Sequence, residues 1–143
     1  MKFISSNYDK ETGIATVVVQ HLGKKFEGSA TGHSEDKENW SEYAGCSYAE
    51  TRAMIKALKY ERELAKRKSD EAIDFMKSCE CYTGFDKDSP STKVFYRQMN
   101  QRIKRVNDLA DEINNLYNSL DQAIKRREII LNALKAKKAK QDN

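Results

Sequence analysis

Apolar residues recur at alternating intervals of four and three residues through the last third of the chain. Such a repeat is typical of a helix that packs along a coiled-coil seam. We therefore predict a long second helix over residues 91–140, with a seam of about five heptads and a length on the order of 70 Å. The seam has one charged member, Arg127, among the following positions: Met99, Ile103, Val106, Ala110, Ile113, Tyr117, Leu120, Ile124, Arg127, Leu131 and Leu134.

A first helix is predicted over residues 46–80. Ser47 is placed to act as its N-cap, and Glu50 three residues later completes a capping box. Residues 81–90 form the predicted connection, in which Ser89 and Pro90 supply an N-cap and a first helical residue for the second helix. The apolar stripe of the first helix recurs every three, four or seven residues: Ile55, Leu58, Ala65, Ala72, Met76 and Cys79.

The two predicted helices differ in length, so the seam of the longer one extends beyond its neighbour. An apolar seam left in water is unstable, and self-association is the simplest way to cover it. We therefore expect a homo-oligomer.

The first 45 residues are predicted to form a small antiparallel sheet followed by a polar loop. Short strands are predicted over residues 2–6, 14–20 and 25–31, with the second the most β-branched stretch of the chain. Three short strands cannot bury both faces of a sheet by themselves. We therefore expect Trp40 and Tyr43 in the following loop to cover part of it. The predicted fold is thus α+β, a single domain over residues 1–143 whose two long antiparallel helices form a coiled-coil hairpin.

Composition narrows the class of protein further. Charged residues make up 34% of the 143 residues, more than the roughly 25% of an average globular chain. No apolar stretch is long enough to cross a membrane, no secretory segment is seen at the start, and three cysteines do not make a disulfide framework. We therefore expect a cytoplasmic protein. Its net charge of +4 is concentrated in residues 91–143, which hold 12 basic and 6 acidic side chains.

Catalytic and metal-binding patterns are missing from the sequence. It has neither a Walker-type loop nor a GxGxxG motif, and its two histidines, His21 and His33, both fall in or beside the predicted sheet. Cys79 and Cys81 lack the two-residue gap of common zinc pairs. We expect no catalytic residue, no metal and no cofactor, and hence no enzyme.

The segment between the helices is the best candidate for ligand binding. Tyr82 and Phe85 precede a helix N-terminus, whose free N–H groups suit phosphate, and both rings can stack on a base. The simpler interpretation is that these rings only pack the loop. Arg52 in the first helix becomes a candidate for an anion-binding pocket if a second subunit packs against its face of the helix. Aromatic, amide and guanidinium groups follow the loop within three turns: Tyr96, Arg97, Asn100, Arg102 and Arg105.

Three stretches resemble the first-described Thoeris anti-defence family of phage proteins. They are residues 2–17, the stretch 35–38 together with 44–46, and residues 85–90. Members of that family are not enzymes but sponges, which sequester the cyclic ADP-ribose isomers made by TIR-domain proteins of bacterial Thoeris immunity. The resemblance implies an oligomer of helical hairpins, either a dimer or a hexamer built from dimers, that acts in the cytoplasm of an infected bacterium. It implies a ligand of the glycocyclic type, held at subunit interfaces without cleavage, and the binding of cyclic oligonucleotides by some members.

The resemblance also implies roles for particular residues. An aromatic stack near the inter-helix loop and arginines on the helices are similar to the family's pockets. Phe85 with Tyr82 would then stack on the base, and the anion clamps would be Arg52, Arg102 and Arg105. Polar contacts are expected from Thr92 and Asn100.

Two other functions remain open from the sequence. A nucleic-acid-binding or protein-inhibiting coiled coil would use the basic second helix, although acidic residues such as Asp108, Asp111 and Asp121 interrupt its charge and argue against nucleic acid. A purely structural coiled coil would give no role to the aromatic residues over positions 82–96.

Overall fold

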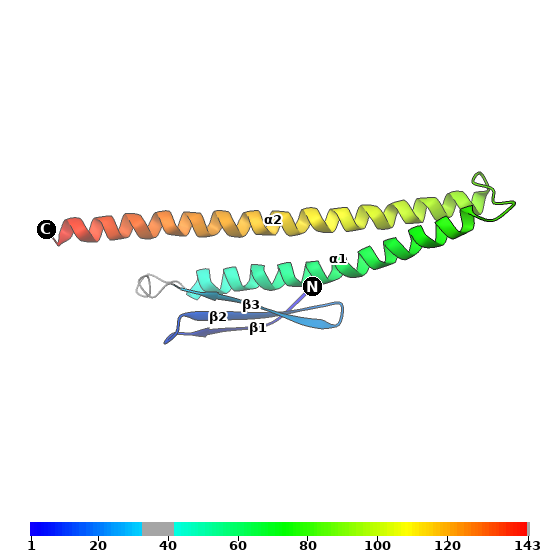
Figure 1. Cartoon of the computed structure of the whole chain (residues 1–143). Helices are drawn as coiled ribbons and strands as arrows, with labels where there is room; N and C mark the ends of the chain where they lie inside the picture. The colour runs from blue at the N-terminus through cyan, green and yellow to red at the C-terminus, as the bar shows by residue number, and fades with distance from the viewer. Residues whose placement is uncertain (33–41, 143) are drawn as a thin grey trace. The chain divides into compact units, whose positions relative to one another are not determined.

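The computed structural model describes residues 1–32 and 42–142. Three strands, β1 (Lys2–Asp9), β2 (Ile14–His21) and β3 (Lys24–Thr31), precede two long helices, α1 (Glu42–Glu80) and α2 (Pro90–Gln141) (Figure 1). The predicted α+β fold class is confirmed. No helix in the described part of the chain is long and apolar enough to cross a membrane.

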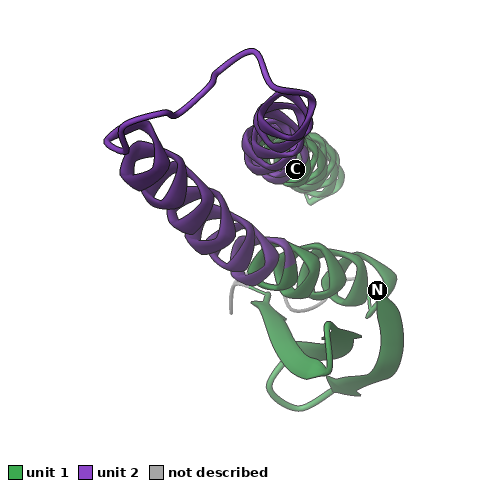
Figure 2. Cartoon of the chain, turned by 90° about the vertical axis from the view of Figure 1, so that its right-hand side faces the viewer, with its two compact units in different colours: residues 1–57, 114–143 green, residues 58–113 purple. Residues whose placement is uncertain are grey.

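Both helices run through two compact units (Figure 2). The sheet unit comprises residues 1–57 and 114–143, which hold the three strands, the start of α1 and the second half of α2. The hairpin unit comprises residues 58–113, which hold the rest of α1, the inter-helix loop and the first half of α2.

The sheet is antiparallel with strand order β1-β2-β3. The β2–β3 hairpin turns at Leu22 and Gly23, whose positive φ values of 51° and 76° fit the type I′ turn that matches strand twist. Asp9 closes the β1–β2 connection, because its carboxylate accepts the N–H of Glu11 at 2.9 Å. Strand β1 pairs with β2 as far as Asp9, which lies opposite Ile14, and so ends three residues beyond its predicted end.

Small residues allow α1 to lie very close to the sheet. Gly28 of β3 has no side chain, and a Cβ added there would overlap the Ala49 carbonyl oxygen and the Ala53 amide nitrogen of α1. The Tyr48 hydroxyl donates to the Ala123 carbonyl of α2 at 3.3 Å, which joins that helix to the same core. The buried core of the sheet unit is Ala15, Val17, Val19, Ala30, Tyr48, Ala49, Ala53, Ala57 and Leu120.

The predicted start of α1 is wrong. The helix begins at Glu42, so Ser47 lies inside it, and the Ser47 carbonyl accepts the Thr51 hydroxyl at 3.1 Å. Packing of Ala44 and Cys46 against the sheet core extends the helix beyond the capping signal. Tyr43 is 84% exposed and does not plug the sheet, while Trp40 and His33 lie outside the described residues.

The predicted N-cap and first residue of α2 are confirmed. Ser89 Oγ accepts the Thr92 N–H at 3.3 Å, and Pro90 is the first helical residue, so the connection spans residues 81–89. The predicted seam is only partly buried, because Tyr117 and Leu134 are exposed while Leu109, outside the seam, is fully buried. An unsupercoiled helix drifts by about 20° per heptad from a strict seven-residue repeat, which shifts the buried stripe onto neighbouring positions.

Candidate functional site

The first half of α2 carries positive charge without any compensating carboxylate of its own. Residues 90–107 contain no Asp or Glu, and the first acidic residue of the helix is Asp108. The helix N-terminus adds the positive end of the backbone dipole to this stretch. Five cationic side chains lie in it: Lys93, Arg97, Arg102, Lys104 and Arg105.

Three of these cations share an open groove of about 440 Å³ on one face of α2. The lining positions are separated by one, three or four residues, which places them on a single helix face. In the described part of the chain, no carboxylate forms an ion pair with Lys93, Arg97 or Lys104. An aromatic ring and two amides complete the lining: Lys93, Tyr96, Arg97, Asn100, Gln101 and Lys104.

Tyr96 connects this groove to the end of α1. Its hydroxyl donates to Glu80 Oε1 at 2.6 Å, the length expected of a hydrogen bond from a hydroxyl to a carboxylate. That hydrogen bond, with a smaller contribution from desolvation, raises the pKa of Tyr96 above the ordinary value of 10.0. The half-buried ring is therefore anchored through its hydroxyl where it lines the groove.

We predict that Tyr96 ionises at higher pH than an ordinary tyrosine and that Glu80→Gln lowers its pKa toward the ordinary value. Because the folded-state pKa is raised, the contribution of this contact to stability is present below about pH 10 and is lost as pH rises through the folded-state pKa. The measurement is a spectroscopic tyrosine titration, with Tyr96→Phe identifying the signal. An unchanged titration in Glu80→Gln would contradict the proposed cause.

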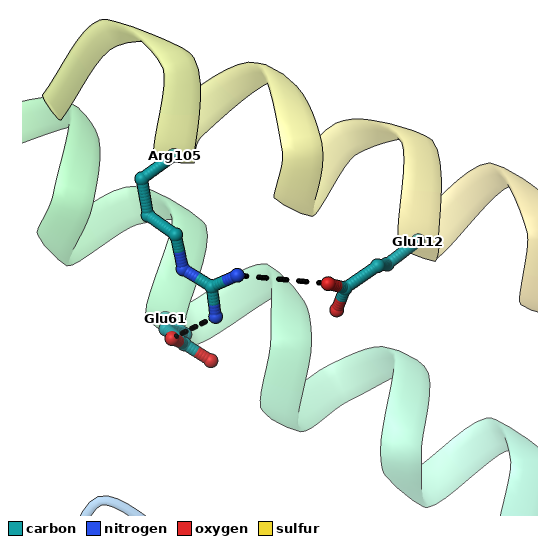
Figure 3. Close-up of polar contacts among 3 residues, drawn as sticks. All are labelled: Glu61, Arg105 and Glu112. Atoms are coloured by element: carbon teal, nitrogen blue, oxygen red, sulfur yellow. Dashed lines mark hydrogen bonds and ion pairs between the residues drawn. The ribbon is translucent and has the colours of Figure 1, made fainter. Parts of the chain in front are cut away.

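Arg105 is held in a network that the sequence did not reveal. Its Nη2 donates to Glu61 Oε1 of α1 at 2.7 Å, and its Nη1 lies 3.5 Å from Glu112 Oε1 of α2 (Figure 3). The hydrogen bond to Glu61 raises the pKa of Arg105 further. These two carboxylates compensate the guanidinium, so an anion clamp at Arg105 would have to displace Glu61 or share the cation with it.

The inter-helix loop presents its two aromatics differently. The Phe85 N–H donates to the Tyr82 carbonyl at 3.2 Å, and Gly84 between them has a φ of 89°. Tyr82 is 74% exposed, whereas Phe85 is half-buried. The Tyr82 ring is thus free to meet a ligand, while the Thr92 hydroxyl accepts a hydrogen bond from the Ser89 hydroxyl at 2.8 Å as part of the helix cap.

Arg52 belongs to the sheet unit, where it covers the edge of β3. Its Nη1 donates to the Ser29 carbonyl at 2.7 Å, and Lys56 Nζ donates to the Glu27 carbonyl at 2.7 Å. Cationic side chains of this kind protect an edge strand from pairing with other chains. Its predicted role as an anion clamp stays a prediction, as does that of Arg102, which is exposed on α2.

Among the predicted binding residues, the groove brings together Tyr96 and Asn100. Lys93, Gln101 and Lys104 were not predicted from the sequence, whereas Arg97 was named among the groups that follow the loop but was given no role. Their helical spacing, combined with the lack of acidic residues over 90–107, is the signal that identifies this face.

No metal-binding cluster of three or more His, Cys, Asp or Glu side chains occurs within residues 1–32 and 42–142. Comparison with family models, curated proteins and solved structures finds no match to this chain.

Proposed function

We propose that this chain binds an anionic nucleotide of the cyclic ADP-ribose class and sequesters it without cleavage. The observation that carries the proposal is the α2 groove, in which three cations without an ion-pair partner among the described residues lie beside an anchored tyrosine. Phosphate needs positive charge, and a base needs an aromatic surface. Both are provided on one face of one helix.

Each group of such a ligand has a partner in the groove. Lys93 and Arg97 lie one helical turn apart and can bind the diphosphate, with the arginine fork giving two parallel hydrogen bonds. The Tyr96 ring is available for stacking on the base, and Asn100 supplies donors and an acceptor for a ribose hydroxyl or a base edge. Tyr82 offers a second exposed ring in the same unit.

The biological role is proposed from the family that the sequence resembles. In that role the chain is a phage anti-defence sponge for Thoeris signals in the cytoplasm of an infected bacterium. A homo-oligomer is part of the proposal, supported by apolar side chains that α2 leaves exposed at Ile129, Ile130 and Leu134. A sponge requires affinity rather than turnover, so the site needs no catalytic group.

The test is calorimetry of the protein against isomers of cyclic ADP-ribose, followed by chromatography of the ligand recovered after heat denaturation. We expect tight binding and intact ligand. Arg97→Ala should weaken binding by about tenfold or more, since a hydrogen bond to a charged group contributes about 1.5–3 kcal/mol. Arg126→Ala, which removes the same charge from an exposed position of α2 outside the groove, is the matched control.

Two results would contradict the proposal. The absence of binding to every isomer would exclude sequestration of this ligand class. Recovery of a cleaved or rearranged ligand would show turnover and make the protein an enzyme.

A further inference from the structure

The cations in the groove extend over more of α2 than a compact nucleotide requires. At 1.5 Å per residue, Lys93 and Arg97 are about 6 Å apart along the helix axis, and Lys104 lies about 10 Å beyond Arg97. Two cations one turn apart are sufficient for the diphosphate of a cyclic ADP-ribose isomer. Lys104 and its neighbour Gln101 continue the same face for two further turns.

We propose that this face also binds single-stranded nucleic acid, with successive phosphates along α2 from Lys93 to Lys104. A linear phosphate chain needs cations in a row, and the three groove cations lie in a row on one helix face. Asn100 and Gln101 lie between them and can donate to sugar or base edges. This activity goes beyond sequestration of a signal nucleotide and does not depend on it.

The ring of Tyr96 favours a single strand over a duplex. Stacking on an aromatic side chain requires an unpaired base, because the bases of a duplex are stacked on each other. The hydrogen bond to Glu80 holds the Tyr96 hydroxyl on the side of α1, which restricts the ring before any ligand arrives. A restricted ring loses less entropy on binding.

Carboxylates limit the length of this site at both ends. Glu80 lies against Tyr96 at the start of α2, and Asp108 follows Lys104 by one turn on the same face. Either carboxylate repels a further phosphate. The site therefore accommodates about three phosphates, and for a single strand the expected slope of log affinity against log salt is about −2.

The test is fluorescence anisotropy of a short labelled oligothymidine with the full chain, between about 50 and about 200 mM salt. Wild type is expected to bind with a slope of about −2, and Lys104→Ala with a slope of about −1.4 and several-fold weaker affinity. Lys125→Ala, an exposed lysine of α2 outside the groove, should leave both unchanged. Tyr96→Phe keeps the ring and should retain binding, whereas Tyr96→Leu removes the ring and should weaken the affinity for oligothymidine several-fold. The melting temperature of Tyr96→Leu shows whether the variant is folded.

The same variants separate this proposal from the sponge. Lys104→Ala should weaken the binding of oligothymidine more than that of cyclic ADP-ribose, because Lys93 and Arg97 hold the diphosphate, whereas Arg97→Ala should weaken both ligands. Failure of oligothymidine to bind overturns this inference and leaves the sponge standing. Equal binding of a duplex of the same length overturns the single-strand preference. If Lys125→Ala weakens binding as much as Lys104→Ala, overall positive charge and not the groove determines binding, and the proposed site is overturned.

Discussion

Gly28→Ala is expected to destabilise the protein by about 3 kcal/mol or more, at the upper end of the usual cost of overpacking. The new methyl group would collide with backbone atoms of Ala49 and Ala53, and backbone cannot move aside as a flexible side chain does. Helix α1 must therefore move away from β3, which opens the contact that buries Val17 and Ala30. Urea denaturation gives the free energy of unfolding, and the melting temperature should fall by on the order of 10 °C.

Gly23→Ala is the matched control for this experiment. It adds the same methyl group where no atom lies within 4 Å, but at a φ of 76°. The left-handed conformation costs a non-glycine residue roughly 1–2 kcal/mol, so the control should lose less stability than Gly28→Ala. Equal losses in the two variants would show that the close approach of α1 to the sheet is not what Gly28 provides.

Leu109→Ala is expected to lower the free energy of unfolding by about 2–5 kcal/mol. Its side chain has no exposed surface, so the substitution removes buried methyl groups and leaves a cavity in the hairpin unit. The effect should be independent of protein concentration, because the burial occurs within one chain. Chemical denaturation at two protein concentrations measures both properties.

Leu134→Ala makes the same chemical change at a position that is 45% exposed. Within one chain it should cost less than about 1 kcal/mol, as surface substitutions do. If a second copy covers this part of α2, the cost should increase with protein concentration. A loss comparable to that of Leu109→Ala in the dilute monomer would contradict the burial seen along α2.

Local sequence signals account for most of the secondary structure. The β-branched run of β2, the cap at Ser89 and Pro90, and the four-three repeat of α2 each act over a few residues. Such signals depend on backbone preferences and helix period, which are the same in any surroundings. The start of α1 was misplaced because packing of Ala44 and Cys46 onto the sheet outweighed the capping signal at Ser47.

The candidate site was predicted in part. Tyr96 and Asn100 were selected because aromatic and amide groups follow the loop at short spacing, and they do line the groove. Arg105 was selected for its charge, but its partner Glu61 lies 44 residues away in the sequence, and no local pattern indicates that pairing. The same holds for Arg52, whose carbonyl partner at Ser29 lies in a different element.

The sequence by itself thus determined which elements form and where charge accumulates, because both follow from residue types at short spacing. Only the tertiary structure decided which cations are left for a ligand. Arg52 and Arg105 are engaged by the Ser29 carbonyl and by Glu61, whereas no carboxylate among the described residues pairs with Lys93, Arg97 or Lys104. The physical reason is that an ion pair depends on distance in space, and folding sets that distance for residues far apart in the chain.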